Sequence, residues 1–86
     1  MGLDTVELVM EIEKTFGISI PDADAATLYT VADLQGYIVT ARTAVGRPVA
    51  ADQAWTALCD ILEHRHGIRR TKITPKARIV ADLGLD

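Results

Sequence analysis

Apolar residues recur every three or four positions in three separate segments of the chain. This period matches an α-helical turn, so each segment predicts an amphipathic helix with one buried face. A chain of 86 residues has room for one core, which several modest helices fill better than a sheet with a deep pocket. The positions expected to face this core are Leu8, Ile12 and Phe16, then Val31, Leu34, Ile38 and Ala41, and finally Ala51, Trp55, Leu58 and Leu62.

Capping residues indicate where the first two helices begin and end. The first is predicted over residues 4–16, with Asp4 as its N-cap and Gly17 as the residue that stops it. The second is predicted to begin after Thr30, because Asp33 stands three positions later and completes a capping box. The sequence therefore predicts two well-defined helix starts.

The remaining segments are assigned by their glycines, prolines and apolar spacing. Residues 49–65 are expected to form the longest helix, which Gly67 stops, and residues 43–48 are the clearest linker. Residues 18–21 read as an extended connection, followed by a short helix near residues 22–27. These assignments predict an all-α fold, a small four-helix bundle.

The last segment, residues 68–86, is predicted to be a long loop. Thr74 followed by Pro75 resembles an N-cap and a first helical residue, so one turn of helix is expected there. A loop of this length in a small domain is usually functional or anchored to the core by apolar side chains. The candidate anchors are Ile68, Ile73, Ile79, Val80 and Leu83.

Composition excludes several classes of protein. The net charge is −3, so the broad positive surface that nucleic acid requires is not expected. The N-terminus lacks the pattern of a signal peptide, and no apolar run approaches the roughly 20 residues of a membrane span. We therefore expect a cytoplasmic protein that binds neither nucleic acid nor membrane. Cys59, the single cysteine, lies in an apolar helical run and predicts a buried thiol.

No catalytic or metal-binding set is recognisable. A nucleophile, a base and an orienting group do not occur together in a pattern, so the chain is predicted not to be an enzyme. His64 and His66 diverge on a helix and lack a third ligand at the usual spacing. A frayed helix end with two exposed histidines is the better interpretation.

Residues 65–78 carry six basic side chains and no acidic one. Three interpretations stay open for this stretch. It forms an anion site, it contacts the acidic helix of another copy, or it is a solvated loop that balances the acidic half of the chain.

Three short runs of residues have a recognisable pattern. Residues 3–10 read Leu-Asp-Thr-Val-Glu-Leu-Val-Met, residues 16–22 read Phe-Gly-Ile-Ser-Ile-Pro-Asp, and residues 82–86 read Asp-Leu-Gly-Leu-Asp. The first two runs resemble the recognition helix of acyl carrier proteins and its exit, and the third resembles the motif before that helix. Residues 1–42 thus resemble the second half of this family and residues 49–86 its first half, as in a circularly permuted chain.

The resemblance implies a bundle of acyl-carrier-protein type and places the cofactor position at the junction of the two ends. In the family a serine there holds phosphopantetheine, flanked by the positions of Asp86 and Leu3. The matching residue here is Gly2, which has no hydroxyl, so no cofactor is expected on this chain. Ser19 and Thr5 fall out of register with the attachment position. Alternatively, a longer chain supplies the serine after Asp86.

The resemblance also implies a docking face on the first helix. The matching positions are Asp4, Val6, Glu7, Met10 and Glu11. An apolar ridge edged by carboxylates suits a carrier-protein-dependent enzyme with a basic rim, of fatty-acid or polyketide metabolism. Without the resemblance, the same residues read as ordinary surface side chains.

Both ends of the chain carry the tripeptide Gly-Leu-Asp, at residues 2–4 and 84–86. The tail of one copy therefore competes with the start of another, which favours exchange of segments between copies. Assembly by segment exchange is the third hypothesis, beside the interaction module and the complete carrier.

Overall fold

The computed structural model describes residues 3–86 and confirms the predicted all-α class. Its elements are α1 (Leu3–Phe16), α2 (Asp22–Ala25), α3 (Val31–Ala44), α4 (Ala51–His66) and a short 3₁₀ turn, η1 (Arg70–Lys72). Within the described residues there is no strand, only an isolated antiparallel bridge between Thr30 and Arg78. No helix in this part of the chain has the length and apolar character needed to cross a membrane.

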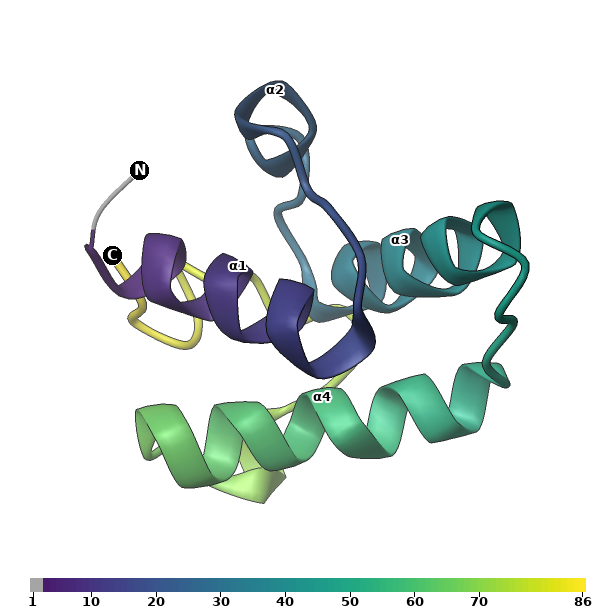
Figure 1. Cartoon of the computed structure of the whole chain (residues 1–86). Helices are drawn as coiled ribbons and strands as arrows, with labels where there is room; N and C mark the ends of the chain where they lie inside the picture. The colour runs from purple at the N-terminus through teal and green to yellow at the C-terminus, as the bar shows by residue number, and fades with distance from the viewer. Residues whose placement is uncertain (1–2) are drawn as a thin grey trace.

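The long helices pack around α4, which contacts both α1 and α3 (Figure 1). The short α2 stands at the side of the bundle, between α1 and α3 in the chain. The last segment passes behind α1 and ends beside the start of that helix, so residues from the two ends of the chain lie close together (Figure 1).

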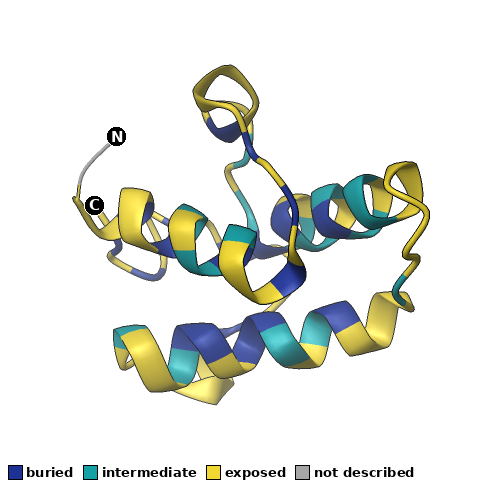
Figure 2. Ribbon diagram, viewed as in Figure 1, coloured by how far each residue is buried: buried dark blue, intermediate teal, exposed yellow. Residues whose placement is uncertain are grey.

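The core lies where the predicted apolar stripes of α1, α3 and α4 meet (Figure 2). One predicted core position is wrong: Ala51 is exposed, whereas Ala54 is completely buried. Ala51 is the first residue of α4 and lies before the helix reaches the core. Ala41 and Trp55 are only partly buried. The confirmed core positions are Leu8, Ile12, Phe16, Val31, Leu34, Ile38, Leu58 and Leu62.

The start of α3 follows the predicted capping box. The Thr30 hydroxyl oxygen accepts from the Asp33 N–H at 3.1 Å, and the Asp33 carboxylate accepts from the N–H of Thr30 at 3.1 Å. A second bond comes from the Tyr29 N–H at 3.0 Å. The backbone donors of Thr30 and Tyr29 lower the pKa of Asp33, because they stabilise its charged form.

The start of α1 differs from the prediction. The helix begins at Leu3, so Asp4 lies inside its first turn and does not cap it. The signal was misleading because aspartate is favoured both at the N-cap and within the first helical turn, near the positive end of the dipole. The end of α1 is as predicted, since Gly17 takes a left-handed conformation with φ of 66°.

The connection between α3 and α4 lies slightly later than predicted. α3 continues through Ala44, so the connection covers residues 45–50. Arg42 holds it in place: Nε donates to the Arg47 carbonyl at 2.6 Å, and Nη1 donates to the Phe16 carbonyl at 2.9 Å. One guanidinium therefore ties the linker to the end of α1.

The C-terminal segment is anchored by apolar side chains, as predicted, but not by all the expected ones. Ile73, Ile79 and Leu83 are buried, Ile68 is partly buried, and Val80 is 58% exposed. Val80 was misassigned because a local run of two apolar residues cannot show which of them points inward. Two further anchors, Ala77 and Leu85, were not predicted.

The single helical turn of this segment lies at η1 and not at Thr74-Pro75. The carbonyl of Thr74 accepts from the Ala77 N–H at 3.1 Å, which closes a tight turn of the chain. Threonine followed by proline favours turns as well as helix starts, so the local signal was ambiguous.

We predict that Ile79→Ala lowers the free energy of unfolding by about 2–4 kcal/mol, because it removes a buried side chain that anchors the segment. Val80→Ala, at the exposed neighbour, should change it by less than about 0.5 kcal/mol. Urea denaturation followed by circular dichroism measures both. Equal effects of the two substitutions would contradict the described position of this segment.

Candidate functional site at the start of α1

The first turn of α1 donates hydrogen bonds to the other end of the chain. The backbone N–H groups of Asp4 and Thr5 donate to the carbonyl oxygen of Asp86, at N···O distances of 2.7 and 3.2 Å. The first N–H groups of a helix have no partner within the helix and need an external acceptor. Asp86 supplies that acceptor, so the structure brings Asp86 to the helix that begins at Leu3.

The register of these bonds is that of an ordinary helix start. When Gly2 is counted as the residue after Asp86, Asp4 is the third residue beyond it and Thr5 is the fourth. Carbonyl acceptance from the third and fourth following N–H groups is the pattern of a first helical turn. Asp86 therefore occupies the position of an N-cap. The predicted attachment position, Gly2, lies outside the described residues.

A compact loop holds Asp86 in this position. The Asp82 carboxylate accepts from the Arg78 N–H at 2.8 Å and from its guanidinium at 3.2 Å. Leu83 and Leu85 on either side of Gly84 are buried, and Gly84 has a φ of 70° that favours glycine. The Arg78 guanidinium and then its backbone N–H lower the pKa of Asp82.

Ser19 and Thr5, the two hydroxyl residues predicted to be out of register with the attachment position, lie at opposite ends of α1. A phosphodiester to phosphopantetheine needs a hydroxyl oxygen, which the resemblance places directly after the position of Asp86. Ser19 lies in the connection after α1, at the opposite end of that helix. Thr5 lies at the correct end, but its side chain is buried and stands four positions after Asp86. Neither residue supplies an accessible hydroxyl at the attachment position.

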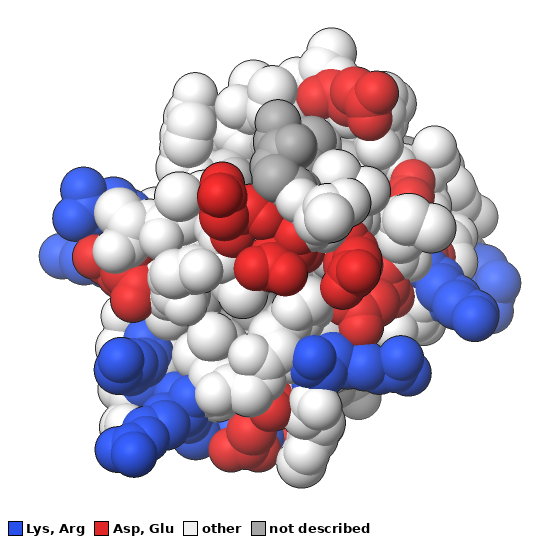
Figure 3. Space-filling model, turned by 90° about the vertical axis from the view of Figure 1, so that its left-hand side faces the viewer, with Lys and Arg blue, Asp and Glu red and all other residues white. Residues whose placement is uncertain are grey.

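The outer face of α1 combines exposed apolar and acidic side chains. Leu3 is 80% exposed, Met10 is 60% exposed and Val6 is 39% exposed, while Asp4 and Glu7 also face solvent. In the view of Figure 3, Asp and Glu gather in the middle of one face, with Lys and Arg toward its edges. This arrangement leaves four of the five predicted docking residues accessible to a partner.

Met10 also lines an open groove of about 610 Å³ between α1 and α4. Ala57 and Ile61 of α4 face the same groove, and Glu7 and Arg65 are among the charged residues that line it. The groove therefore offers an apolar floor between charged edges.

Glu11, the fifth predicted docking residue, is engaged within the chain. Its carboxylate lies 2.6 Å from Nε2 of His66 and 3.7 Å from Nε of Arg65. The side chain of His66 is only 5% exposed, so the prediction of two exposed histidines is wrong for His66 and right for His64. The error arose because the partner of His66 lies 55 positions away in the sequence.

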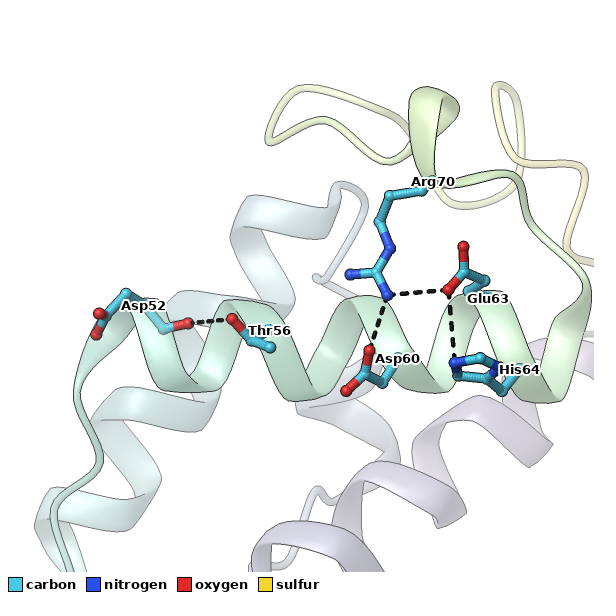
Figure 4. A network of polar contacts seen from close by, with 6 residues as sticks. All are labelled: Asp52, Thr56, Asp60, Glu63, His64 and Arg70. Carbon is cyan, nitrogen blue, oxygen red and sulfur yellow. Dashed lines mark hydrogen bonds and ion pairs between the residues drawn. The ribbon is translucent and has the colours of Figure 1, made fainter.

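A second cluster on α4 joins Asp60, Glu63 and His64 (Figure 4). Nη2 of Arg70 lies 2.8 Å from Asp60 and 3.0 Å from Glu63, so one guanidinium is paired with both carboxylates. These bonds lower the pKa of Glu63 and raise that of Arg70. Arg70 therefore fastens η1 to α4, and its ion pairs occupy the carboxylates that a metal ion would need. Beside it, burial raises the pKa of the Cys59 thiol.

An apolar pocket of about 320 Å³ lies next to the first turn of α1. Sequence reasoning missed it because its walls come from four segments that only the fold brings together. Its lining residues are Thr5, Leu8, Val9, Ala25, Ala26, Leu28, Tyr29, Leu34, Arg78, Ile79, Val80 and Ala81. Most of these side chains are apolar, so the pocket favours an aliphatic or aromatic group over a charged one.

Comparison with known proteins adds two findings. Residues 3–38 match the family model described as "Phosphopantetheine attachment site". The chain is also 60% identical over 38 residues to the acyl carrier protein of Chloroherpeton thalassium (strain ATCC 35110 / GB-78). Both matches support a relationship to acyl carrier proteins, over a region that for the family model runs from α1 into α3.

The similarity covers part of each protein. The aligned region is 44% of this chain and 48% of the relative, so the chain spans about half the length of the curated relative that it matches. No solved structure matches the chain.

We predict that Asp82→Asn lowers the thermal midpoint at pH 7, because it removes the carboxylate that holds the loop before Asp86. The pKa of Asp82 is depressed below its ordinary value of 3.8 in the folded state. Its contribution to stability is therefore present above the unfolded pKa and is lost as the pH falls through the lower folded pKa. Thermal melts from pH 7 to pH 2 should show the difference between wild type and variant shrinking on acidification.

Asp22→Asn is the matched control, since the Asp22 side chain is exposed and makes no hydrogen bond or ion pair among the described residues. It should leave the midpoint unchanged at pH 7. A difference between wild type and Asp82→Asn that stays constant down to pH 2 would count against the role given to this carboxylate.

Proposed function

We propose that this chain is a non-enzymatic, acyl-carrier-protein-like interaction module of fatty-acid or polyketide metabolism, with its two halves in exchanged order. In this proposal Gly2 stands at the phosphopantetheine attachment position, so the chain docks to enzymes without carrying the cofactor. The observation that carries the proposal is the pair of hydrogen bonds from Asp4 and Thr5 to Asp86. They join the end of the chain to α1 in the register of one continuous helix start.

The extent of the sequence similarity supports exchanged order. An alignment that runs in one direction along both chains can match only one half of a permuted protein. The match covers 44% of this chain and 48% of the relative, close to one half of each. Residues 49–86, which lie outside the family-model match, supply α4 and the loop that reaches α1.

An alternative function is a complete carrier whose serine follows Asp86 in a longer protein. The apolar pocket favours this alternative, because it opens beside Thr5 and has the lining to shelter an apolar chain. The two proposals share one scaffold and differ only in whether a hydroxyl stands at the junction.

The proposed partner is a carrier-protein-dependent enzyme with a basic rim and an apolar notch. Leu3, Val6 and Met10 supply exposed apolar contacts, and Asp4 and Glu7 supply negative charge at their edges. Glu11 is assigned a lesser role, because His66 and Arg65 already balance its charge. Rates of association should depend on the acids, and affinity more on the apolar side chains.

We predict that incubation with coenzyme A and a broad phosphopantetheinyl transferase leaves the mass of this chain unchanged. The Gly2→Ser variant should gain the mass of the phosphopantetheine arm, because its new hydroxyl follows the Asp86 cap in register. Gly2→Ala is the matched control, since it adds a side chain without a hydroxyl. Intact-mass spectrometry measures all three.

A mass gain on the unaltered chain would overturn the proposed lack of a cofactor, and Thr5→Ala would then show whether Thr5 is modified. No gain on Gly2→Ser would overturn the exchanged-order register. A natural protein with serine directly after Asp86, modified at that serine, would establish the alternative.

We predict that Met10→Ala weakens binding of the same transferase by about 1 kcal/mol or more, because Met10 is 60% exposed and supplies an apolar side chain to the proposed docking face. Val45→Ala removes a side chain of similar exposure on the linker and should have no effect. Isothermal titration calorimetry compares the two variants. If both variants lost the same affinity for the transferase, or only Val45→Ala lost affinity, the docking face would lie elsewhere.

A further inference from the structure

Two charged surfaces of this chain have no ion-pair partner among residues 3–86. Three of the six cations in residues 65–78 are engaged within the chain, since Arg65, Arg70 and Arg78 all lie within 4 Å of a carboxylate. Among residues 3–86 the other three cations make no such contact. A solvated loop that balances nearby acids therefore explains the three paired cations of this stretch and leaves the other three without an assigned role.

The unengaged cations form what we call the basic surface, made of Arg69, Lys72 and Lys76. Arg69 and Lys72 are joined by the first turn of η1, where the Lys72 N–H donates to the Arg69 carbonyl at 2.9 Å. Lys72 and Lys76 line one shallow hollow. The remaining charged residue of that hollow, Asp82, is already held by Arg78, so the hollow keeps a net positive charge.

The unengaged carboxylates at the start of α1 form what we call the acidic surface, made of Asp4, Glu7 and Asp86. Asp4 and Asp86 are held together by the backbone bond of 2.7 Å, and Glu7 follows Asp4 by one helical turn. All three side chains are exposed and make no ion pair within the described residues. Three negative charges are thus gathered at one corner of the molecule.

We propose that a second copy of this chain binds here, with the acidic surface of each copy against the basic surface of the other. The side chains of the two surfaces carry equal and opposite formal charges. In a twofold pairing each copy presents the same two surfaces to the other, so both contacts form together. This inference stands on charge and position, independently of the proposed function.

Exposed apolar side chains accompany the charges. Leu3 lies beside the acidic surface, and Val80 lies in the segment that continues from the basic surface. Burial of these side chains strengthens the contact, while the charges set its orientation. Because the charges are exposed, the association is expected to be weak and strongly dependent on salt.

Sedimentation equilibrium of the 86-residue chain tests the proposal. A monomer–dimer equilibrium is expected at an ionic strength of about 0.01 M, where charges act over roughly 30 Å, and mainly monomer at about 0.15 M, where they act over roughly 8 Å. Lys72→Glu with Lys76→Glu should raise the dissociation constant at low salt by about tenfold or more, as should Glu7→Lys. Arg47→Glu, an exposed charge reversal on the linker, is the control and should leave it unchanged.

Mixing the two defective proteins is the decisive step. The lysine variants keep the acidic surface and the Glu7→Lys variant keeps the basic surface, so a mixed dimer restores one contact and pairs reversed charges in the other. Recovery of dimer in the mixture supports the proposal. A monomer at every concentration at low salt, an equal effect of Arg47→Glu, or no recovery on mixing would overturn it. None of these outcomes bears on transferase modification, so the two proposals fail separately.

Discussion

The hydrogen bonds that Asp4 and Thr5 donate to the Asp86 carbonyl are the interaction on which the rest of the structure depends. They satisfy donors that a helix cannot satisfy for itself, and they do so with a residue from the far end of the sequence. α1 carries both a stripe of the core and the exposed acidic face. One contact between distant segments therefore positions a helix that packs against the core on one face and exposes acidic side chains on the other.

The charged residues divide into two groups with different roles. Arg42 and Arg70 each bind carbonyls or carboxylates in a way that fastens a connecting segment to a helix, and Arg78 binds Asp82 within the C-terminal loop. The Glu11 carboxylate likewise contacts a residue of the chain itself, the imidazole of His66. Among the charges left facing solvent, acidic side chains gather at the start of α1 and basic side chains follow α4. Both proposals of partner binding depend on these two surfaces.

Local signals predicted the helices well and the irregular segment less well. The capping box at Thr30 and the stop at Gly17 were confirmed, because each depends on residues within a few positions of one another. Val80 and Thr74-Pro75 were misassigned, because the direction of a side chain or a turn in a loop depends on what the loop packs against. Position in the bundle likewise left Ala51 outside the core.

The amino-acid sequence alone determined the helical class, the inward stripes and the exposed apolar ridge of α1, since a period of 3.6 residues is a property of neighbouring positions. Only the tertiary structure decided that Asp86 caps α1, that His66 is buried against Glu11, and that four segments enclose an apolar pocket. These features join residues far apart in the chain. The spacing of residues along the chain does not predict these contacts, because they depend on how the helices pack and on the paths of their connections.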